Sequence, residues 1–187
     1  MKNQCTIAMF IDLSKAFDCL KYNQLFKKMG FTKESTNWFK NYLTDRKQCV
    51  EVNDTLSEWN AVKLGVPQGS ILGLILFLIY VNDINHSDKD SKFVKFADDT
   101  TILTTGKDIE EATTNMNNAL SKFKDWFLMN KLNLNSSKTR YMIFNHKTDK
   151  IDHLTINDTQ ITRVWDKGTE KSFKLVGIHI DEKLRCI

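Results

Sequence analysis

Two neighbouring aspartates, Asp98 and Asp99, lie between two β-prone runs that cover residues 93–97 and 100–104. This layout predicts a two-residue hairpin turn with both carboxylates at its tip. At about 4 Å and an effective dielectric constant near 20, the repulsion between them is roughly 4 kcal/mol, so water or a cation must reduce it. Aspartate is also common in ordinary solvated turns, so the pair alone does not establish a cation site.

A third carboxylate, Asp12, lies near the end of an apolar, β-prone run over residues 5–13. Central strands of one sheet can bring their ends together, so we expect the carboxylates of Asp12 and Asp98 to lie within metal-bridging reach on adjacent strands. Three carboxylates there would suit Mg²⁺, a hard ion that prefers oxygen ligands. On the residues alone, the metal site and the solvated turn both remain open.

An unusual loop surrounds Pro67, the single proline of the chain, because three of the seven glycines fall within residues 65–73. Proline fixes φ, whereas Gly65 and Gly69 permit conformations or close approaches that a Cβ would block. Ser70 predicts the N-cap of a helix that runs to about residue 84 and is buried on most faces. The same residues also suit a plain turn that leads into this helix.

The remaining patterns indicate an α+β domain with a mostly antiparallel sheet and helices packed on one face. A glycine cap at Gly30 and apolar residues three or four apart predict three more helices. These cover residues 22–29, 33–45 and 108–131. Further strands are predicted over residues 48–53, 59–64, 141–145, 154–156, 160–165 and 173–181, with turns at 53–54 and 156–159.

Composition is that of one ordinary globular domain, with 187 residues, 41% hydrophobic and 27% charged. The net charge of +4 permits contact with nucleic acid without requiring it. The four cysteines follow no zinc-ligand spacing and indicate reduced thiols, so we expect an intracellular protein of the nucleus or cytoplasm. The longest apolar run, residues 71–81, is too short to span a membrane, and we expect no membrane partner.

Three strings resemble, in order and spacing, core motifs of reverse transcriptases, and those of non-LTR (LINE-type) retrotransposons most closely. They are residues 10–18 (FIDLSKAFD), 65–73 (GVPQGSILG) and 96–99 (FADD). Three further segments are similar to other parts of the family: residues 38–46 (WFKNYLTDR), 133–139 (NLNSSKT) and 174–181 (KLVGIHID). The resemblance covers nearly the whole chain.

This resemblance implies a polymerase palm with a ferredoxin-like βαββαβ core and RNA-directed DNA synthesis. A deoxynucleotide (dNTP) would be joined to the 3′-hydroxyl of a DNA primer on an RNA template, with two Mg²⁺ ions or Mn²⁺ in their place. In family terms, Asp12 and Asp98 would hold both ions, Asp99 would lie beside them, and the backbone carbonyl of Leu13 would add a ligand.

The resemblance also implies roles for residues outside the acidic cluster. Phe17 matches a bulky gate against the ribonucleotide 2′-hydroxyl, which predicts deoxynucleotide preference, although a plain core phenylalanine is the alternative. Lys138 matches a proton donor or electrostatic partner of the leaving pyrophosphate, with an ordinary surface lysine as the alternative. Gln68 and Gly69 would lie along the template base and the nascent pair. Arg46 and Lys47 are weaker candidates for contact with nucleic-acid phosphates, since solvated charge is the default.

The chain is short for this family, in which a fingers region precedes the palm and a thumb follows it. We therefore expect residues 1–187 to be one palm domain without fingers or thumb, with residues 148–187 forming a hairpin and strand at the palm–thumb border. The competing hypothesis is an inactive retroelement remnant that at most binds nucleic acid or a partner protein. An RNA-directed RNA polymerase is a third class, against which Phe17 argues.

Overall fold

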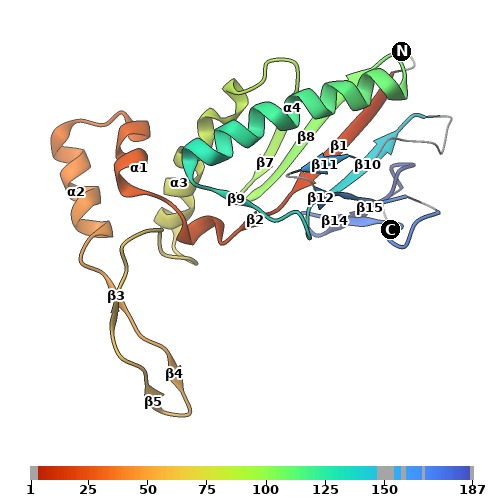
Figure 1. Ribbon diagram of the computed structural model, residues 1–187. Coiled ribbons are helices and arrows are strands. Elements are labelled where there is room, and N and C mark those ends of the chain that lie inside the picture. The colour runs from red at the N-terminus through yellow and green to blue at the C-terminus, as the bar shows by residue number, and fades with distance from the viewer. Residues whose placement is uncertain (1–3, 147–153, 157–158, 166, 186–187) are drawn as a thin grey trace. The chain divides into compact units, whose positions relative to one another are not determined.

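The computed structural model describes residues 4–146, 154–156, 159–165 and 167–185 (Figure 1). The chain divides into two compact units. The first, the sheet unit, comprises Met1–Ser14, Asp83–Met129 and Asn133–Ile187, and the second, the helical unit, comprises Lys15–Asn82 and Asn130–Leu132. In the part of the chain that the structure describes, no helix is both long and apolar enough to cross a membrane.

The sheet unit is built on a five-stranded sheet with the strand order β13-β10-β1-β8-β7. Its central strand, β1, is almost entirely buried, as its apolar sequence predicts, and pairs antiparallel with both β10 and β8. β7 also pairs antiparallel with β8, whereas β13 is parallel to β10. The predicted combination of α-helices with a mainly antiparallel sheet is therefore confirmed. The bounds are β1 Cys5–Ile11, β7 Lys92–Phe96, β8 Asp99–Gly106, β10 Arg140–Phe144 and β13 Thr162–Arg163.

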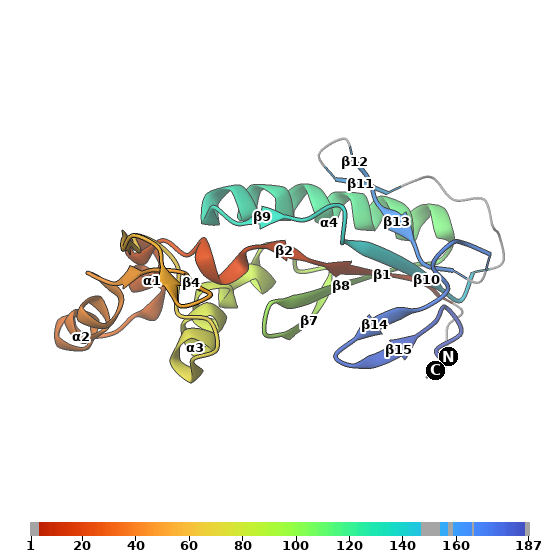
Figure 2. The ribbon, with the colours of Figure 1, turned by 90° about the horizontal axis from the view of Figure 1, so that it is seen from below.

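One face of this sheet is covered by α4 (Ile109–Asn130), as Figures 1 and 2 show. The buried side chains of α4 follow helical spacing, as predicted, and include Ala112, Met116 and Phe123. The ring of Phe123 packs edge-on against Phe93 of β7, with 5.2 Å between ring centroids. These contacts place the main apolar core of the unit between α4 and the sheet.

The opposite face is covered by a hairpin of β14 (Phe173–Leu175) and β15 (Ile178–Ile180), seen below the sheet in Figure 2. Phe173 stacks on Phe10 of β1 with ring centroids 4.2 Å apart, within a cluster that includes Ala8 and Met142. Four short strands, in two antiparallel pairs, complete the described part of the unit. They are β9 (Asn133–Leu134), which pairs with β2 (Leu13–Ser14), and the pair β11 (Thr155–Ile156) and β12 (Thr159–Gln160). Residues 157–158 of the predicted 156–159 turn lie outside the described residues.

The helical unit contains the other three α-helices. They are α1 (Tyr22–Met29), α2 (Lys33–Leu43) and α3 (Ile71–Tyr80), preceded by the 3₁₀ turn η1 (Ala16–Asp18). Gly30 has φ 61° and ends α1, as predicted. Lys28 donates to the backbone carbonyl of Tyr80 at 2.7 Å and ties α1 to α3.

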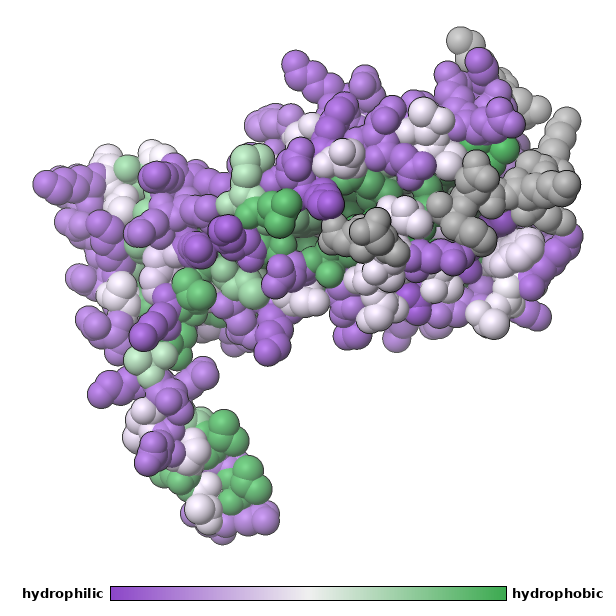
Figure 3. Space-filling view, in the orientation of Figure 1, coloured by the Kyte–Doolittle hydropathy of each residue, from purple (hydrophilic) through white to green (hydrophobic). Residues whose placement is uncertain are grey.

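An exposed β-hairpin extends from residue 47 to residue 61 of the helical unit. It pairs β3 (Lys47–Gln48) with β6 (Asn60–Ala61) and β4 (Glu51–Val52) with β5 (Thr55–Leu56). Asn53 and Asp54, at its tip, both have positive φ, which matches the predicted turn. Figure 3 shows that several apolar side chains gather on this hairpin.

The Ser70 side chain caps α3 as predicted, by accepting a hydrogen bond from the Gly73 N–H at 2.9 Å. The predicted extent and burial of this helix are wrong. The α-helix ends at Tyr80 and is followed by the 3₁₀ turn η2 (Asn82–His86). Ile71 is 84% exposed, and Ile75 and Leu78 are also exposed, because only one side of α3 packs within its unit. The continuous hydrophobic sequence of α3 therefore does not correspond to burial on all sides of the helix.

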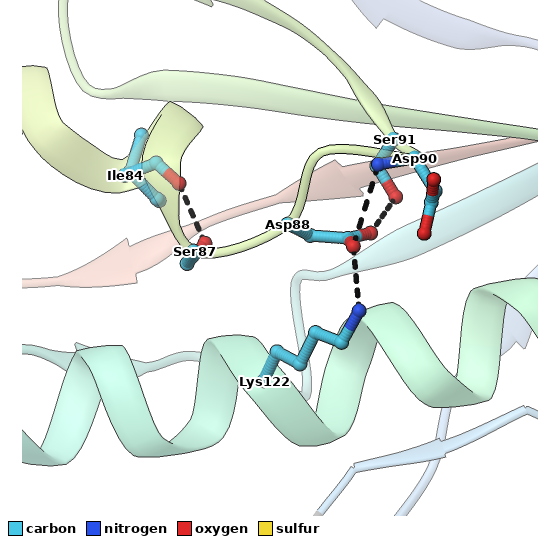
Figure 4. Close-up of polar contacts among 6 residues, drawn as sticks. All are labelled: Ile84, Ser87, Asp88, Asp90, Ser91 and Lys122. Carbon is cyan, nitrogen blue, oxygen red and sulfur yellow. Dashed lines mark hydrogen bonds and ion pairs between the residues drawn. The ribbon is translucent and has the colours of Figure 1, made fainter.

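The segment that leads into β7 is attached to α4 by the buried carboxylate of Asp88 (Figure 4). Lys122 of α4 donates to Asp88 at 2.8 Å, and the hydroxyl of Ser91 donates to its other oxygen at 2.5 Å. Burial opposes ionisation of Asp88, but the hydrogen bonds from Lys122 and Ser91 outweigh it and hold the pKa of this carboxyl below its ordinary value. The start of β7 is thereby fixed on the helix.

Replacing Asp88 by asparagine is expected to change the acid dependence of stability. Because the folded-state pKa of Asp88 lies below its ordinary value of 3.8, the ionised carboxylate adds stability above that pH and loses it as pH falls further. The melting temperature of the wild type should thus exceed that of Asp88→Asn at pH 6, and the difference should shrink toward pH 3. The same substitution at the exposed Asp125 of α4 is the control, and a pH-independent difference for Asp88→Asn would contradict the prediction.

Candidate functional site

Three carboxylates lie at one end of two adjacent strands of the sheet unit. Asp12 directly follows β1, whereas Asp98 precedes β8 and Asp99 is its first residue. Because β1 and β8 are antiparallel and Ile11 is paired with Thr100, the register brings Asp12 beside Asp99. The fold therefore gathers acids that are more than eighty residues apart in the sequence.

The hairpin tip differs by one residue from the predicted turn. Phe96 pairs with Asp99, so the two turn residues are Ala97 and Asp98 rather than both aspartates. Ala97 adopts φ 53°, a left-handed conformation that residues with a side chain rarely adopt. The backbone of Asp99 is thereby fixed in the β7–β8 ladder, whereas Asp98 lies in the turn, and both residues are exposed.

The electrostatics of this site are those of like charges held together. Partial burial, and then the neighbouring carboxylates of Asp98 and Asp12, raise the pKa of Asp99 above its ordinary value. Carboxylate oxygens are the donors that Mg²⁺ prefers, and a bound cation would relieve this repulsion. Among the described residues, no three or more side chains of His, Cys, Asp or Glu form a ready-made metal site. The site thus fits a divalent cation by donor type and charge, without a preformed set of three ligands.

The backbone on both sides of Asp12 is held by the turn that contains Lys138. The carbonyl of Asp12 accepts from the N–H of Asn135 at 2.9 Å, and its N–H donates to the hydroxyl of Thr139 at 3.4 Å. Lys138 itself is exposed. Leu13, the other predicted metal ligand, is paired with Leu134 in the short β2–β9 ladder. Sequence reasoning missed the part played by Asn135 and Thr139, although their place in the motif with Lys138 was a usable signal.

The predicted nucleotide-binding residues Phe17, Gln68 and Gly69 all belong to the helical unit. Phe17 is half-buried and packs against Phe77 of α3, with 4.7 Å between ring centroids. The amide of Gln68 donates to the carboxylate of Asp18 at 3.1 Å, and Gly69 is exposed in the loop before α3. The backbone of this loop thus lies against η1, the 3₁₀ turn that contains Phe17.

The approach between the loop and η1 depends on the absence of a side chain at Gly65. A Cβ there would lie 2.7 Å from both the Cα of Asp18 and the carbonyl oxygen of Phe17, and Gly65 also has φ +79°. Gly69, four residues later, has a similar φ of +76° but nothing within 4 Å of its Cβ position. The predicted close approach of a glycine therefore occurs at Gly65, and the partner is the protein's own backbone.

Replacing Gly65 by alanine is expected to lower the free energy of unfolding by about 2–3 kcal/mol, since both the positive φ and the backbone contact become unfavourable. The matched variant Gly69→Ala should lose only about 1–2 kcal/mol, the cost of a left-handed alanine. Chemical denaturation of the two variants measures this difference. An equal loss of unfolding free energy in the two variants would show that the contact between Gly65 and η1 does not contribute to stability.

The two weaker nucleic-acid candidates differ in their surroundings. Arg46 is partly buried and donates to the carbonyl of Gly65 at 2.7 Å, to the hydroxyl of Tyr22 at 2.9 Å and to the carbonyl of Leu43 at 3.0 Å. Its guanidinium therefore stabilises the Gly65 loop. Lys47 is the first residue of the exposed strand β3, at the base of the hairpin.

Comparison with known proteins bears on this arrangement. The profile of the family described as "Reverse transcriptase (RNA-dependent DNA polymerase)" matches residues 1–180. A curated relative, "RNA-directed DNA polymerase from mobile element jockey" of Drosophila melanogaster, is 27% identical over an alignment of 187 positions that covers 95% of this chain. "Probable RNA-directed DNA polymerase from transposon BS" of the same species is 30% identical over an alignment of 156 positions that covers 79% of this chain. The chain spans only 20% and 17% of the length of these two relatives.

Solved structures of similar fold include telomerases. One is the telomerase of Candida tropicalis in complex with a TWJ fragment of telomeric RNA, with a TM-score of 0.60 and 14% identity over 98% of this chain and 29% of the other. Another is the corresponding complex from Candida albicans, with a TM-score of 0.61 and 15% identity over 97% of this chain and 31% of the other. At this identity the likeness concerns the fold.

The family match covers almost every motif that the sequence singled out, from the strand before Asp12 to the β14–β15 hairpin. Relatives named as polymerases of mobile elements confirm the resemblance to reverse transcriptases of non-LTR retrotransposons. The chain belongs to the reverse transcriptase (RNA-dependent DNA polymerase) family.

Proposed function

We propose that this chain is the palm of a retrotransposon reverse transcriptase, with a ferredoxin-like core, which joins a dNTP to the 3′-hydroxyl of a DNA primer opposite an RNA template. The observation that carries the proposal is that Asp12, Asp98 and Asp99 lie at one end of β1 and β8, within the segment that the family profile matches. Partial burial, and then the neighbouring carboxylates of Asp98 and Asp12, raise the pKa of Asp99, and a bound cation would offset both effects.

Asp12 and Asp98 would hold two Mg²⁺ ions, or Mn²⁺ in their place, with Asp99 beside them and the carbonyl of Leu13 as a further ligand. Bound divalent ions would supply charge stabilisation for the attacking primer oxygen and the departing pyrophosphate. The protein contributes position rather than covalent chemistry. The hydrogen bonds from Asn135 and to Thr139 orient the backbone of Asp12 for this task.

The remaining proposed roles belong to side chains outside the acidic cluster. Lys138 would neutralise or protonate the leaving pyrophosphate, and its exposure leaves the ammonium group accessible. Phe17 would exclude the 2′-hydroxyl of a ribonucleotide, while its packing on Phe77 holds the ring in place. Gln68 and Gly69 would lie along the template base and the nascent pair. Lys47, exposed on β3, would contact phosphates, whereas Arg46 acts through the Gly65 loop.

The partners of the proposed enzyme are an RNA template, a DNA primer and dNTP. Because the chain spans about 20% of the jockey polymerase, we propose that fingers and thumb segments of a longer protein complete the grip on primer and template. The palm would then supply the metal ligands, and the flanking segments would supply affinity for the duplex.

Extension of a DNA primer on an RNA template by the 187-residue chain tests the proposal. Each dNTP is offered singly with Mg²⁺, on templates that differ only in the first unpaired base. We expect addition of the complementary nucleotide alone, and none after chelation of Mg²⁺. Addition irrespective of the template base would contradict template-directed synthesis. No addition, together with equal nucleic-acid affinity of the wild type and Asp98→Asn, would favour the inactive, binding-only remnant.

A further inference from the structure

The guanidinium of Arg140, at the start of β10, joins two segments of the sheet unit. Its Nε and Nη2 donate to the two carboxylate oxygens of Glu170 at 2.6 and 2.8 Å. Its Nη1 donates to the backbone carbonyls of Ser137 and Thr139 at 2.7 and 3.0 Å. A bidentate pair of this kind fixes geometry as well as charge. Arg140 thus connects the turn of residues 135–139 to the loop before β14.

That same turn holds the backbone of Asp12 through both neighbouring peptide groups. The N–H of Asn135 donates to the carbonyl of Asp12, and the N–H of Asp12 donates to the Thr139 hydroxyl. The Thr139 hydroxyl in turn donates to the carbonyl of Asn135 at 2.8 Å. Thr139 is fully buried, so water does not replace these bonds while the turn is intact. Any displacement of the turn is therefore passed to Asp12.

The loop that contains Glu170 has its own attachment to the sheet. The carbonyl of Glu170 accepts from the N–H of Trp165 at 3.0 Å. Three residues later, Phe173 stacks on Phe10, which lies two residues before Asp12. Glu170 is therefore a fixed partner for Arg140 rather than a freely moving surface carboxylate.

A basic residue near a polymerase site could instead bind a phosphate, but the contacts of Arg140 argue against that role. Four N–H donations, two to Glu170 and two to carbonyls, occupy most of the five N–H groups of the guanidinium. The hydrogen bond from Arg140 also holds the pKa of Glu170 below its ordinary value, which keeps the balancing negative charge in place. The charge of Arg140 is therefore balanced within the protein by the carboxylate of Glu170.

We propose that Arg140 and Glu170 are positioning residues that set the backbone of Asp12 through the 135–139 turn. This inference deepens the proposed function and rests on it, because the carboxylate of Asp12 can serve as a metal ligand only where its backbone places it beside β8. Neither residue touches substrate, and both act through Asn135 and Thr139.

Amide hydrogen exchange on the 187-residue chain tests whether Arg140 holds the 135–139 turn, and this experiment does not require catalytic activity. In Arg140→Met, the amide of Asn135 should exchange about tenfold faster than in the wild type, because the turn opens locally more often. The amides of Ala8 and Ile143, in the centre of the sheet, should keep their rates. Arg185→Met, which removes another arginine paired with a carboxylate of the same unit, is the matched control and should leave Asn135 unchanged.

A milder variant keeps the test decisive if Arg140→Met does not fold. Glu170→Gln retains an acceptor for Arg140 but loses the charge, and should accelerate exchange at Asn135 by about threefold. An unchanged rate at Asn135 would overturn the proposal. So would equal acceleration of all amides, because that result indicates general destabilisation instead of a local effect on the turn.

The effect of Arg140 on catalysis is measured by the kinetics of primer extension. Where the wild type extends primers, Arg140→Met should lower kcat about tenfold and leave KM for the dNTP unchanged, as expected when a group is misplaced without loss of substrate binding. An unchanged kcat with accelerated exchange would refute the link to catalysis. If the wild type does not extend primers, the proposed function fails, whereas the exchange experiment still decides whether Arg140 holds the turn.

Discussion

Replacing Asp98 by asparagine should lower the rate of dNTP addition by about a thousandfold, the scale seen when a group that stabilises transition-state charge is lost. Asparagine has nearly the same shape but no negative charge, so it weakens binding of the divalent ion while the hairpin tip keeps its backbone. Because Asp98 is exposed in the turn, the substitution should leave the melting temperature nearly unchanged. Single-turnover primer extension measures the rate.

The control for this variant is Asp125→Asn, which removes one exposed carboxylate from α4 that does not belong to the acidic cluster. It should extend primers at the wild-type rate. Comparable activity of Asp98→Asn and Asp125→Asn would mean that Asp98 is an ordinary solvated turn residue, the alternative that the sequence left open.

Replacing Phe17 by valine should raise the incorporation of ribonucleotides relative to deoxynucleotides by about a hundredfold, or roughly 2.7 kcal/mol of discrimination. The smaller side chain would leave room for the 2′-hydroxyl. Stability should also fall, because the half-buried ring of Phe17 packs against Phe77. Competition between matched ribonucleotides and deoxynucleotides in primer extension gives the ratio.

Phe26→Val separates the two effects of that substitution. Phe26 is a half-buried phenylalanine on α1 of the same unit, so its loss should reduce stability without altering the sugar preference. If Phe17→Val destabilises the protein and leaves the sugar preference unchanged, Phe17 is a core residue and not a gate.

The sequence predicted best those features that depend on local chemistry. Ser70 caps α3 through its own hydroxyl, and Gly30 ends α1 with the positive φ that glycine adopts readily. Asn53 and Asp54 form their turn for the same reason, since both tolerate the left-handed conformation. Each of these signals lies within a few residues of the structure it specifies.

The hairpin tip shows where local reasoning failed. Two adjacent aspartates are better turn residues than alanine, so the sequence favoured a turn at Asp98 and Asp99. The strand register decided otherwise, because Thr100 pairs with Ile11 and Phe96 pairs with Asp99. Ala97 then takes the left-handed conformation in spite of its side chain. Pairing across the sheet outweighed the preference of one residue.

The sequence did not predict the contacts between distant segments, for a different reason. Arg140 and Glu170 are thirty residues apart, and neither belongs to a motif with a recognisable spacing. Likewise, the attachment of Asp88 to Lys122 depends on how α4 lies across the sheet. The acidic cluster was easier to predict from the sequence, since an aspartate at the end of an apolar strand indicates its own position in the sheet.

The most direct test of a metal site at Asp12 and Asp98 is Mn²⁺ binding measured by electron paramagnetic resonance. The wild-type chain and the double variant Asp12→Asn with Asp98→Asn are compared, with an RNA template, a DNA primer that lacks its 3′-hydroxyl, and the matching dNTP. We predict that the wild type binds Mn²⁺ at least tenfold more tightly than the double variant, because the paired carboxylates supply the ligands. Equal Mn²⁺ affinity of the two proteins would contradict the assignment of these aspartates as the metal site.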